Sequence, residues 1–208
     1  MGNWEKFNSF ATWMVKIAYL NILWIFFTLC GLVLFGLFPS TGAMFSIVQK
    51  WLRKEPVGRI FPAFWKIYKK DFISLNKFGL FFIAIGYIIV YDFLFIQMNG
   101  EKLQLLYPVI GFVAISYFLT LLYFFPVYTQ FEMKFFQYIK QSFLLGAGSL
   151  LETILIITSF MLLTIIIRFV PGIIPVFTGS VMAVVITYCS NRALHRINSR
   201  RKPMNLNI

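Results

Sequence analysis

The sequence predicts an all-α fold, a polytopic bundle of transmembrane helices with about five spans in helical hairpins and with amphipathic helices at the membrane interface. The 208-residue chain is 60% hydrophobic and only 12% charged, against about 25% charged in an average soluble domain. Its mean hydropathy is +0.80. Its apolar residues also gather in runs of the roughly 20 residues that a membrane helix needs. One membrane domain over residues 1–208 accounts for the whole length.

The predicted elements follow these runs in chain order. Residues 1–16 form an interfacial N-terminal segment, because the first long run begins only at Ile17. That run is too long for the apolar part of a cleaved signal peptide, so we expect it to be retained. The spans are expected at 17–38, 78–98, 103–128, 143–167 and 169–190, with a basic cytoplasmic loop at 50–77 and a basic cytoplasmic tail at 191–208.

The first span has an alternative that the sequence leaves open. The uncharged run continues past residue 38 as far as Gln49. A single span would place the N-terminus outside, which Lys6 and Lys16 oppose because basic residues collect on the cytoplasmic side. A tight or re-entrant hairpin over residues 17–50 would keep both of its ends inside. Five spans are the preferred interpretation.

The charge distribution predicts the orientation and the partners. The chain has 19 Lys and Arg against 7 Asp and Glu, a formal net charge of +12. Basic residues are concentrated in the 50–77 loop and the tail, whereas the other two turns carry one basic residue each, Lys102 and Arg168. The loop and the C-terminus are therefore expected in the cytoplasm, facing anionic lipid headgroups of the bilayer. Nucleic acid is excluded as a partner, since no basic face is free of hydrophobic spans.

Aromatic and basic residues alternate at helical spacing over residues 64–72. This pattern is typical of an interfacial amphipathic helix, although a cytoplasmic helix packed on the bundle would show the same periodicity. Residues 135–143 align with this segment at an offset of 71, which indicates either an internal duplication or the chance likeness of two such helices. The candidate lipid-facing or partner-facing residues are Arg53, Lys54, Trp65, Lys66, Lys69 and Lys70.

Two acidic residues interrupt the apolar runs, where a charge at the centre of a helix costs about 2.5–3.5 kcal/mol on insertion scales. Glu152 lies near the middle of a span that begins at Phe143, which suits cation binding or proton relay. The offset of 71 would instead start that span near Ser149, leaving Glu152 as a structural residue one turn from the cytoplasmic surface. Asp92 is expected near the outer interface, paired with Lys102 or Arg168.

The remaining polar candidates lie in the first run. Pro39, Thr41 and Gly42 could break a helix at membrane depth and free backbone groups for a substrate. A plain helix end at the membrane boundary would give the same sequence. Asn21 is expected to hydrogen-bond a neighbouring helix, which is a common packing device in membranes.

The sequence contains no recognisable catalytic, cofactor or metal motif. A Walker loop, HExxH, CxxC and a Ser–His–Asp set are all missing. Cys30 and Cys189 lie in different apolar runs, and the only histidine, His195, is expected to be solvated in the basic tail. We therefore expect a protein that is not an enzyme and that needs no cofactor.

The N-terminal third resembles the YesL-like family of bacterial membrane proteins of unknown function. The likeness lies in Tyr19–Trp24, Phe38–Met44 and Val48–Arg53, and extends to the aromatic and basic stretch at 64–72. Members are often encoded beside carbohydrate importers of the ATP-binding cassette class. The resemblance implies the bacterial inner membrane, a link to sugar uptake and importer subunits as partners, but it supplies no reaction and no binding residues.

Two functions from different classes are consistent with these features. The first is a non-enzymatic accessory or regulatory component of carbohydrate uptake. The second is a small transporter or channel that uses the Pro39 to Gly42 break and Glu152, and such a thin bundle would favour a homo-oligomer. The sequence names no ligand.

Overall fold

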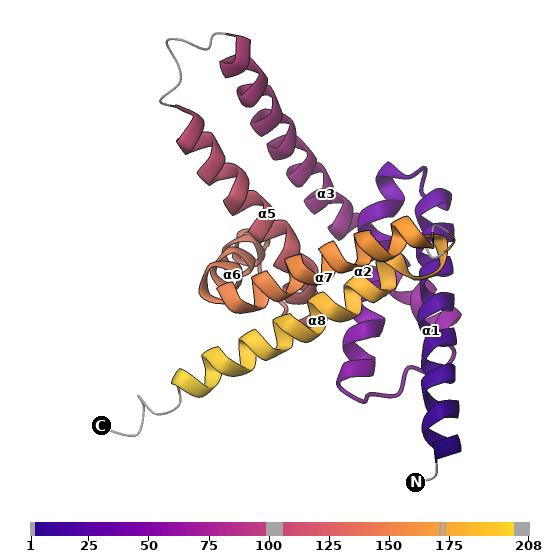
Figure 1. Cartoon of the computed structure of the whole chain (residues 1–208). Helices are drawn as coiled ribbons and strands as arrows, with labels where there is room; N and C mark the ends of the chain where they lie inside the picture. The colour runs from indigo at the N-terminus through magenta and orange to yellow at the C-terminus, as the bar shows by residue number, and fades with distance from the viewer. Residues whose placement is uncertain (1–2, 99–105, 171, 173, 202–208) are drawn as a thin grey trace.

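A computed structural model describes residues 3–98, 106–170, 172 and 174–201, which form seven α-helices and no strand (Figure 1). The predicted all-α fold is confirmed. The helices are α1 (Asn3–Cys30), α2 (Leu34–Leu52), α3 (Ile60–Met98), α5 (Tyr107–Gln130), α6 (Phe135–Gly148), α7 (Leu150–Phe169) and α8 (Ile174–Arg201).

Four of these helices, α1, α3, α5 and α7, are long and apolar enough to cross a membrane. The predicted span 78–98 is the second part of α3, and α5 covers the described part of the predicted span 103–128. The predicted span 169–190 lies mostly in α8, which continues into the basic tail. Length and apolar composition therefore support a membrane protein, as the sequence predicts.

The single helix predicted for 17–38 is wrong: the chain forms two helices joined by a turn, as in the hairpin alternative, and that both ends of the hairpin lie inside stays a prediction. Helix α1 ends at Cys30 and α2 begins at Leu34. The intervening backbone forms a Schellman turn, in which the Leu32 amide donates to the Leu29 carbonyl at 3.0 Å and the Val33 amide donates to the Thr28 carbonyl at 2.9 Å. The predicted interfacial segment 1–16 also differs, because α1 is already helical from Asn3 and continues without a break.

The helix break predicted at Pro39 to Gly42 is also wrong, because these residues lie inside α2. Neighbouring side chains hold this turn of the helix against α1. The Trp24 indole Nε1 donates to Thr41 Oγ1 at 3.0 Å, and the hydroxyls of Thr28 and Ser40 are 2.6 Å apart. These side-chain contacts hold the proline-containing turn of α2 against α1.

The α1–α2 hairpin closes tightly because two glycines meet at its turn. A Cβ on Gly31 would lie 2.3 Å from the Gly36 Cα, and a Cβ on Gly36 would lie 2.4 Å from the Thr28 carbonyl oxygen. Both obstacles are backbone atoms, which cannot rotate away. The hairpin therefore depends on the absence of a side chain at these positions.

The aromatic segment 64–72 is not a separate interfacial helix but part of the continuous 39-residue α3. Its apolar face packs on the bundle, as the second interpretation of the sequence expects. Phe64 and Tyr68 are buried, and each ring centroid lies 5.1 Å from that of Phe27 in α1. Lys66 and Lys69 remain exposed on the opposite face.

Helix α7 begins at Leu150, so the span predicted to start at Phe143 is wrong and the offset of 71 indicates the correct start. Helix α6 ends at Gly148, and Ser149 separates the two helices. The rings of Phe78 in α3 and Phe135 in α6 stack with centroids 4.2 Å apart, in a core that also contains Tyr138 of α6.

We predict that Gly36→Ala destabilises the protein by about 1–3 kcal/mol, the usual cost of overpacking a tight contact. The added methyl group would meet the Thr28 carbonyl, which belongs to the Schellman turn. The measurement is thermal unfolding in detergent.

Gly111→Ala in α5 is the matched control, because nothing lies within 4 Å of its Cβ position. Since alanine is the better helix former, we expect Gly111→Ala to be neutral or stabilising by about 0.5–1 kcal/mol. Equal effects of the two substitutions would contradict the close backbone contact at the α1–α2 turn.

Candidate functional site

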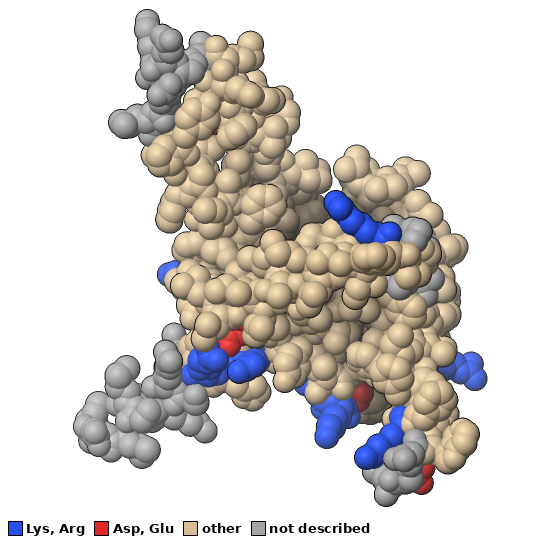
Figure 2. All heavy atoms as spheres, in the orientation of Figure 1, with Lys and Arg blue, Asp and Glu red and all other residues tan. Residues whose placement is uncertain are grey.

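The charged end of the bundle holds the candidate site. In Figure 2 most of the Lys and Arg side chains in view lie toward the lower end of the molecule, where Figure 1 shows both termini. Helices α2 and α5 end on this side, and the loop after α2 carries Arg53 and Lys54.

A cavity of about 450 Å³ opens between α2, α3, α5 and α6 at this end. Charges of both signs line it. An adjoining cavity of about 260 Å³ shares its wall and adds Asn191 and His195 from α8. The charged residues of the larger cavity are Lys50, Arg53, Lys70, Glu55, Asp71 and Glu132.

Three side-chain amides from three helices form the shared wall of the two cavities. The amides of Gln49 in α2 and Asn191 in α8 face each other with both nitrogen–oxygen pairs at 3.2 Å. The Gln130 amide of α5 donates to Asn191 Oδ1 at 2.9 Å. In the opposite orientation of the Gln49 amide its nitrogen and oxygen exchange places against Asn191, and its oxygen accepts from the Arg53 Nε at 2.9 Å. The wall thus joins α2, α5 and α8 through polar contacts.

Asp71 lies in the first part of α3, ahead of the predicted span 78–98, and is only partly exposed. Burial raises the pKa of its carboxyl group, while Lys70 and a hydrogen bond with Tyr128 offset part of that rise. The cavity therefore presents amides, hydroxyls and charged groups of both signs to a polar occupant. Among the described residues, no cluster of three His, Cys, Asp or Glu side chains could hold a metal ion.

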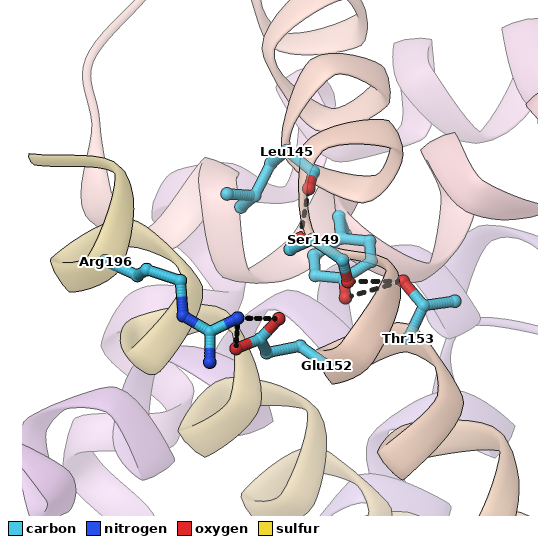
Figure 3. A network of polar contacts seen from close by, with 6 residues as sticks. Leu145, Ser149, Glu152, Thr153 and Arg196 are labelled. Atoms are coloured by element: carbon cyan, nitrogen blue, oxygen red, sulfur yellow. Dashed lines mark hydrogen bonds and ion pairs between the residues drawn. The ribbon is translucent and has the colours of Figure 1, made fainter. Parts of the chain in front are cut away.

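Glu152 forms an ion pair with Arg196 of α8 (Figure 3). The carboxylate is almost fully buried, at 1% exposure, and its two oxygens lie 3.1 and 3.4 Å from the Arg196 Nη1. It occupies the first turn of α7, where the helix dipole also favours a negative charge. The structural interpretation of Glu152 is therefore supported over a midplane acid.

The same corner of the bundle contains a second set of polar contacts (Figure 3). Thr153 Oγ1 lies 3.0 Å from the Tyr123 hydroxyl of α5 and donates to the Ser149 carbonyl at 3.1 Å. The Ser149 hydroxyl donates to the Leu145 carbonyl of α6. These contacts join α5 to the junction between α6 and α7.

The other intramembrane candidates serve helix packing. Asn21 is fully buried, and its Oδ1 accepts the backbone N–H of Ser180 in α8 at 2.9 Å, as the sequence analysis expects for a helix-packing residue. Gly42 lets Leu75 of α3 approach, since a Cβ there would lie 2.3 Å from the Leu75 Cδ1. Pro39 of α2 is buried, as Gly42 is.

Asp92 is exposed on α3. Of its two expected partners, Lys102 lies outside the described residues. The described residues show no ion pair between Asp92 and Arg168. The pairing with Lys102 stays a prediction.

The basic and aromatic candidates divide into two groups. Arg53 and Lys70 line the larger cavity, whereas Lys54 and Lys66 do not. Lys69 lies over the Trp65 ring, with its Nζ 4.5 Å from the ring centroid.

Sequence reasoning missed most of the polar residues of the site, among them the three amides of the shared wall, the acidic residues of the larger cavity and Arg196. Gln49, Gln130 and Asn191 each follow an apolar run on the side predicted to be cytoplasmic, a shared position that could have marked them. Arg196 was assigned to a solvated tail, but α8 continues through Arg201 and carries Arg196 back to Glu152.

Known proteins resemble this chain over most of its length. A family described as "Protein of unknown function, DUF624" matches residues 17–93. The uncharacterized protein YteU of Bacillus subtilis (strain 168) is 32% identical over 199 residues, covering 94% of this chain and 86% of YteU. The uncharacterized proteins YesL and YesV of the same organism are each 31% identical, covering 94% and 90% of this chain and 92% and 90% of their own lengths. No solved structure matches the chain.

We predict that Arg196→Met destabilises the protein by about 3 kcal/mol, because it leaves a buried carboxylate without its partner. Glu152→Gln should cost less, since the Arg196 side chain is 36% exposed and keeps access to water. Arg196→Met should cost less when it is added to Glu152→Gln than when it is introduced alone. Unfolding of the three variants in detergent measures this coupling. Purely additive effects would contradict the ion pair.

Proposed function

Since this chain belongs to the DUF624 family, together with its YesL-like relatives, we propose that it is a non-enzymatic multi-pass protein of the bacterial inner membrane. It acts as an accessory or regulatory component of carbohydrate uptake. Its basic end and its C-terminus face the cytoplasm. A subunit of an ATP-binding cassette importer docks at that end.

The cavity at the basic end is the observation that carries this proposal. Its rim offers Lys50, Arg53 and Lys70 beside three acidic side chains, so a docked protein segment finds partners for either charge. Its wall is fixed by hydrogen bonds between helices, which gives a preorganised surface for docking. Basic residues at this end also favour the cytoplasmic side of the membrane.

The link with sugar uptake rests on the resemblance to YesL-like proteins, whose members are often encoded beside carbohydrate importers. The relatives YteU, YesL and YesV add no activity, since each is an uncharacterized protein. The docking face and the sugar link are thus separate parts of the proposal, and each has its own test below.

The transport alternative has lost the helix break on which it depended, because Pro39 and Gly42 lie within α2. Its two other polar groups take part in helix packing, Asn21 with Ser180 and Glu152 with Arg196. The accessory role uses the polar groups that remain at the basic end.

We predict that the double variant Arg53→Glu/Lys70→Glu loses importer subunits when the chain is purified from mild detergent. Reversing two charges on the cavity rim replaces attraction by repulsion for the acidic groups of a partner. We expect recovery of importer subunits to fall at least about tenfold, which corresponds to about 1.4 kcal/mol of lost binding.

The matched control is Lys66→Glu/Lys69→Glu, which changes the net charge by the same amount at exposed residues outside the cavity. We expect this control to keep the partner. Equal losses from both variants would show nonspecific charge attraction, and recovery of the unmodified chain alone would contradict docking. Growth of a deletion strain on complex sugars tests the carbohydrate link separately.

A further inference from the structure

The turn between α1 and α2 presents only apolar side chains to its surroundings. Leu32 is 80% exposed and Leu34 is 65% exposed, and at least half of Val33 and Phe35 is exposed as well. The sequence places two other turns away from the basic end: residues 99–102 read Asn-Gly-Glu-Lys, and the second turn begins at Arg168. Both carry charge, and a turn in water ordinarily carries polar residues of this kind.

Helix α1 as a whole is long enough to cross a membrane, but the uncharged parts of the two hairpin arms are shorter than the hydrocarbon core of a bilayer. Lys16 is the last charge on α1, and 14 residue steps separate it from Cys30, about 21 Å at the helical rise. From Leu34 to Lys50 the distance along α2 is about 24 Å. The hydrocarbon core of a bilayer measures about 30 Å. Each arm therefore ends inside it.

Helices α3 and α5 have the full length that the hairpin lacks. The segment from Lys77 to Met98 measures about 31 Å along α3. In Figure 1 the α3–α5 pair extends well past the α1–α2 turn at the upper side of the view. Helix α7 is about as short as the hairpin arms, but it ends in Arg168, whose long side chain can reach the interface. The α1–α2 turn has no such group.

The backbone of the turn is adapted to a medium without water. The amides of residues 31, 32, 33 and 34 donate to the carbonyls of Phe27, Leu29, Thr28 and Leu32, at 2.7 to 3.1 Å. Irregular backbone in contact with lipid must satisfy its polar groups in this internal way, since lipid tails offer no partners.

The conformation of Leu32, at the centre of the turn, also indicates that the turn lies in hydrocarbon. Leu32 has a φ of 55°, a left-handed conformation that favours glycine. In water a glycine at this position would remove both the backbone strain and the exposed apolar side chain. In hydrocarbon the leucine side chain is well solvated, which offsets the strain.

We propose that the α1–α2 hairpin is re-entrant, with its tip in the hydrocarbon region and covered by lipid acyl chains. Both arms then begin at the basic end, which places the N-terminus on the same side as the 50–77 loop. This inference concerns the contact with lipid and is independent of any partner at the cavity.

Spin labels at three depths test the proposal in vesicles of phosphatidylcholine and phosphatidylglycerol. Leu32→Cys, Ile88→Cys and Met98→Cys are each introduced into the full chain carrying Cys30→Ser and Cys189→Ala. All three sites are exposed to the surroundings of the bundle. Ile88 lies near the middle of the predicted span 78–98, and Met98 lies at its end.

We expect the label at residue 32 to collide with oxygen and to be shielded from a water-soluble nickel chelate, as the label at residue 88 is. A label at residue 32 that meets the chelate as readily as the label at residue 98 would overturn the proposal. This comparison does not depend on any importer, so its failure is distinct from failure of docking.

The native Cys30 gives a second measurement in the chain with only Cys189→Ala. Cys30 is exposed at the same turn. We expect a membrane-impermeant maleimide, present both inside and outside intact vesicles, to leave it unmodified and to modify it once detergent is added. Modification in intact vesicles would place the tip in water and refute the re-entrant hairpin.

Discussion

Polar contacts to α8 hold this bundle together. In a bilayer the hydrophobic effect does not drive one helix onto another, so packing and hydrogen bonds between helices take its place. In its described part, helix α8 makes such contacts through Ser180, Asn191 and Arg196. Ser180 contacts α1, Asn191 contacts α2 and α5, and Arg196 contacts α7. The last helix of the chain thus fixes the positions of four earlier ones.

The fold was largely predictable because helix formation depends on local composition, whereas the places where helices stop were not. The turn at Gly31 to Val33 carries no proline and no polar residue, so Gly31 and the nearby Gly36 are the only features that separate it from the apolar run around it. Pro39 carries the expected signal of a break, yet packing against α1 keeps α2 intact there. The local sequence signal was weak where α1 ends and misleading at Pro39, because contacts between helices determine where these helices stop.

The site was harder to predict because its residues are far apart in the sequence. The Gln49–Asn191 contact joins residues 142 positions apart, and the Asn21–Ser180 contact joins residues 159 positions apart. A polar residue in an apolar run must find a partner, but the partner is either a ligand or another side chain. For Glu152 the partner is Arg196, and only the fold of α8 shows this.

The offset of 71 explains why two similar segments end differently. It equates Leu75 with Gly146 and Lys77 with Gly148, so α3 has side chains where α6 has none. Leu75 packs against Gly42 of α2, while Gly146 lies against the ring of Tyr123 in α5. In α3 the large residue, Leu75, packs on a glycine of the neighbouring helix, whereas in α6 the glycine, Gly146, packs on a large residue of the neighbouring helix. Helix α3 therefore continues into its span without a break, whereas α6 stops at Gly148 and a new helix begins at Leu150, which brings Glu152 to the basic end beside Arg196.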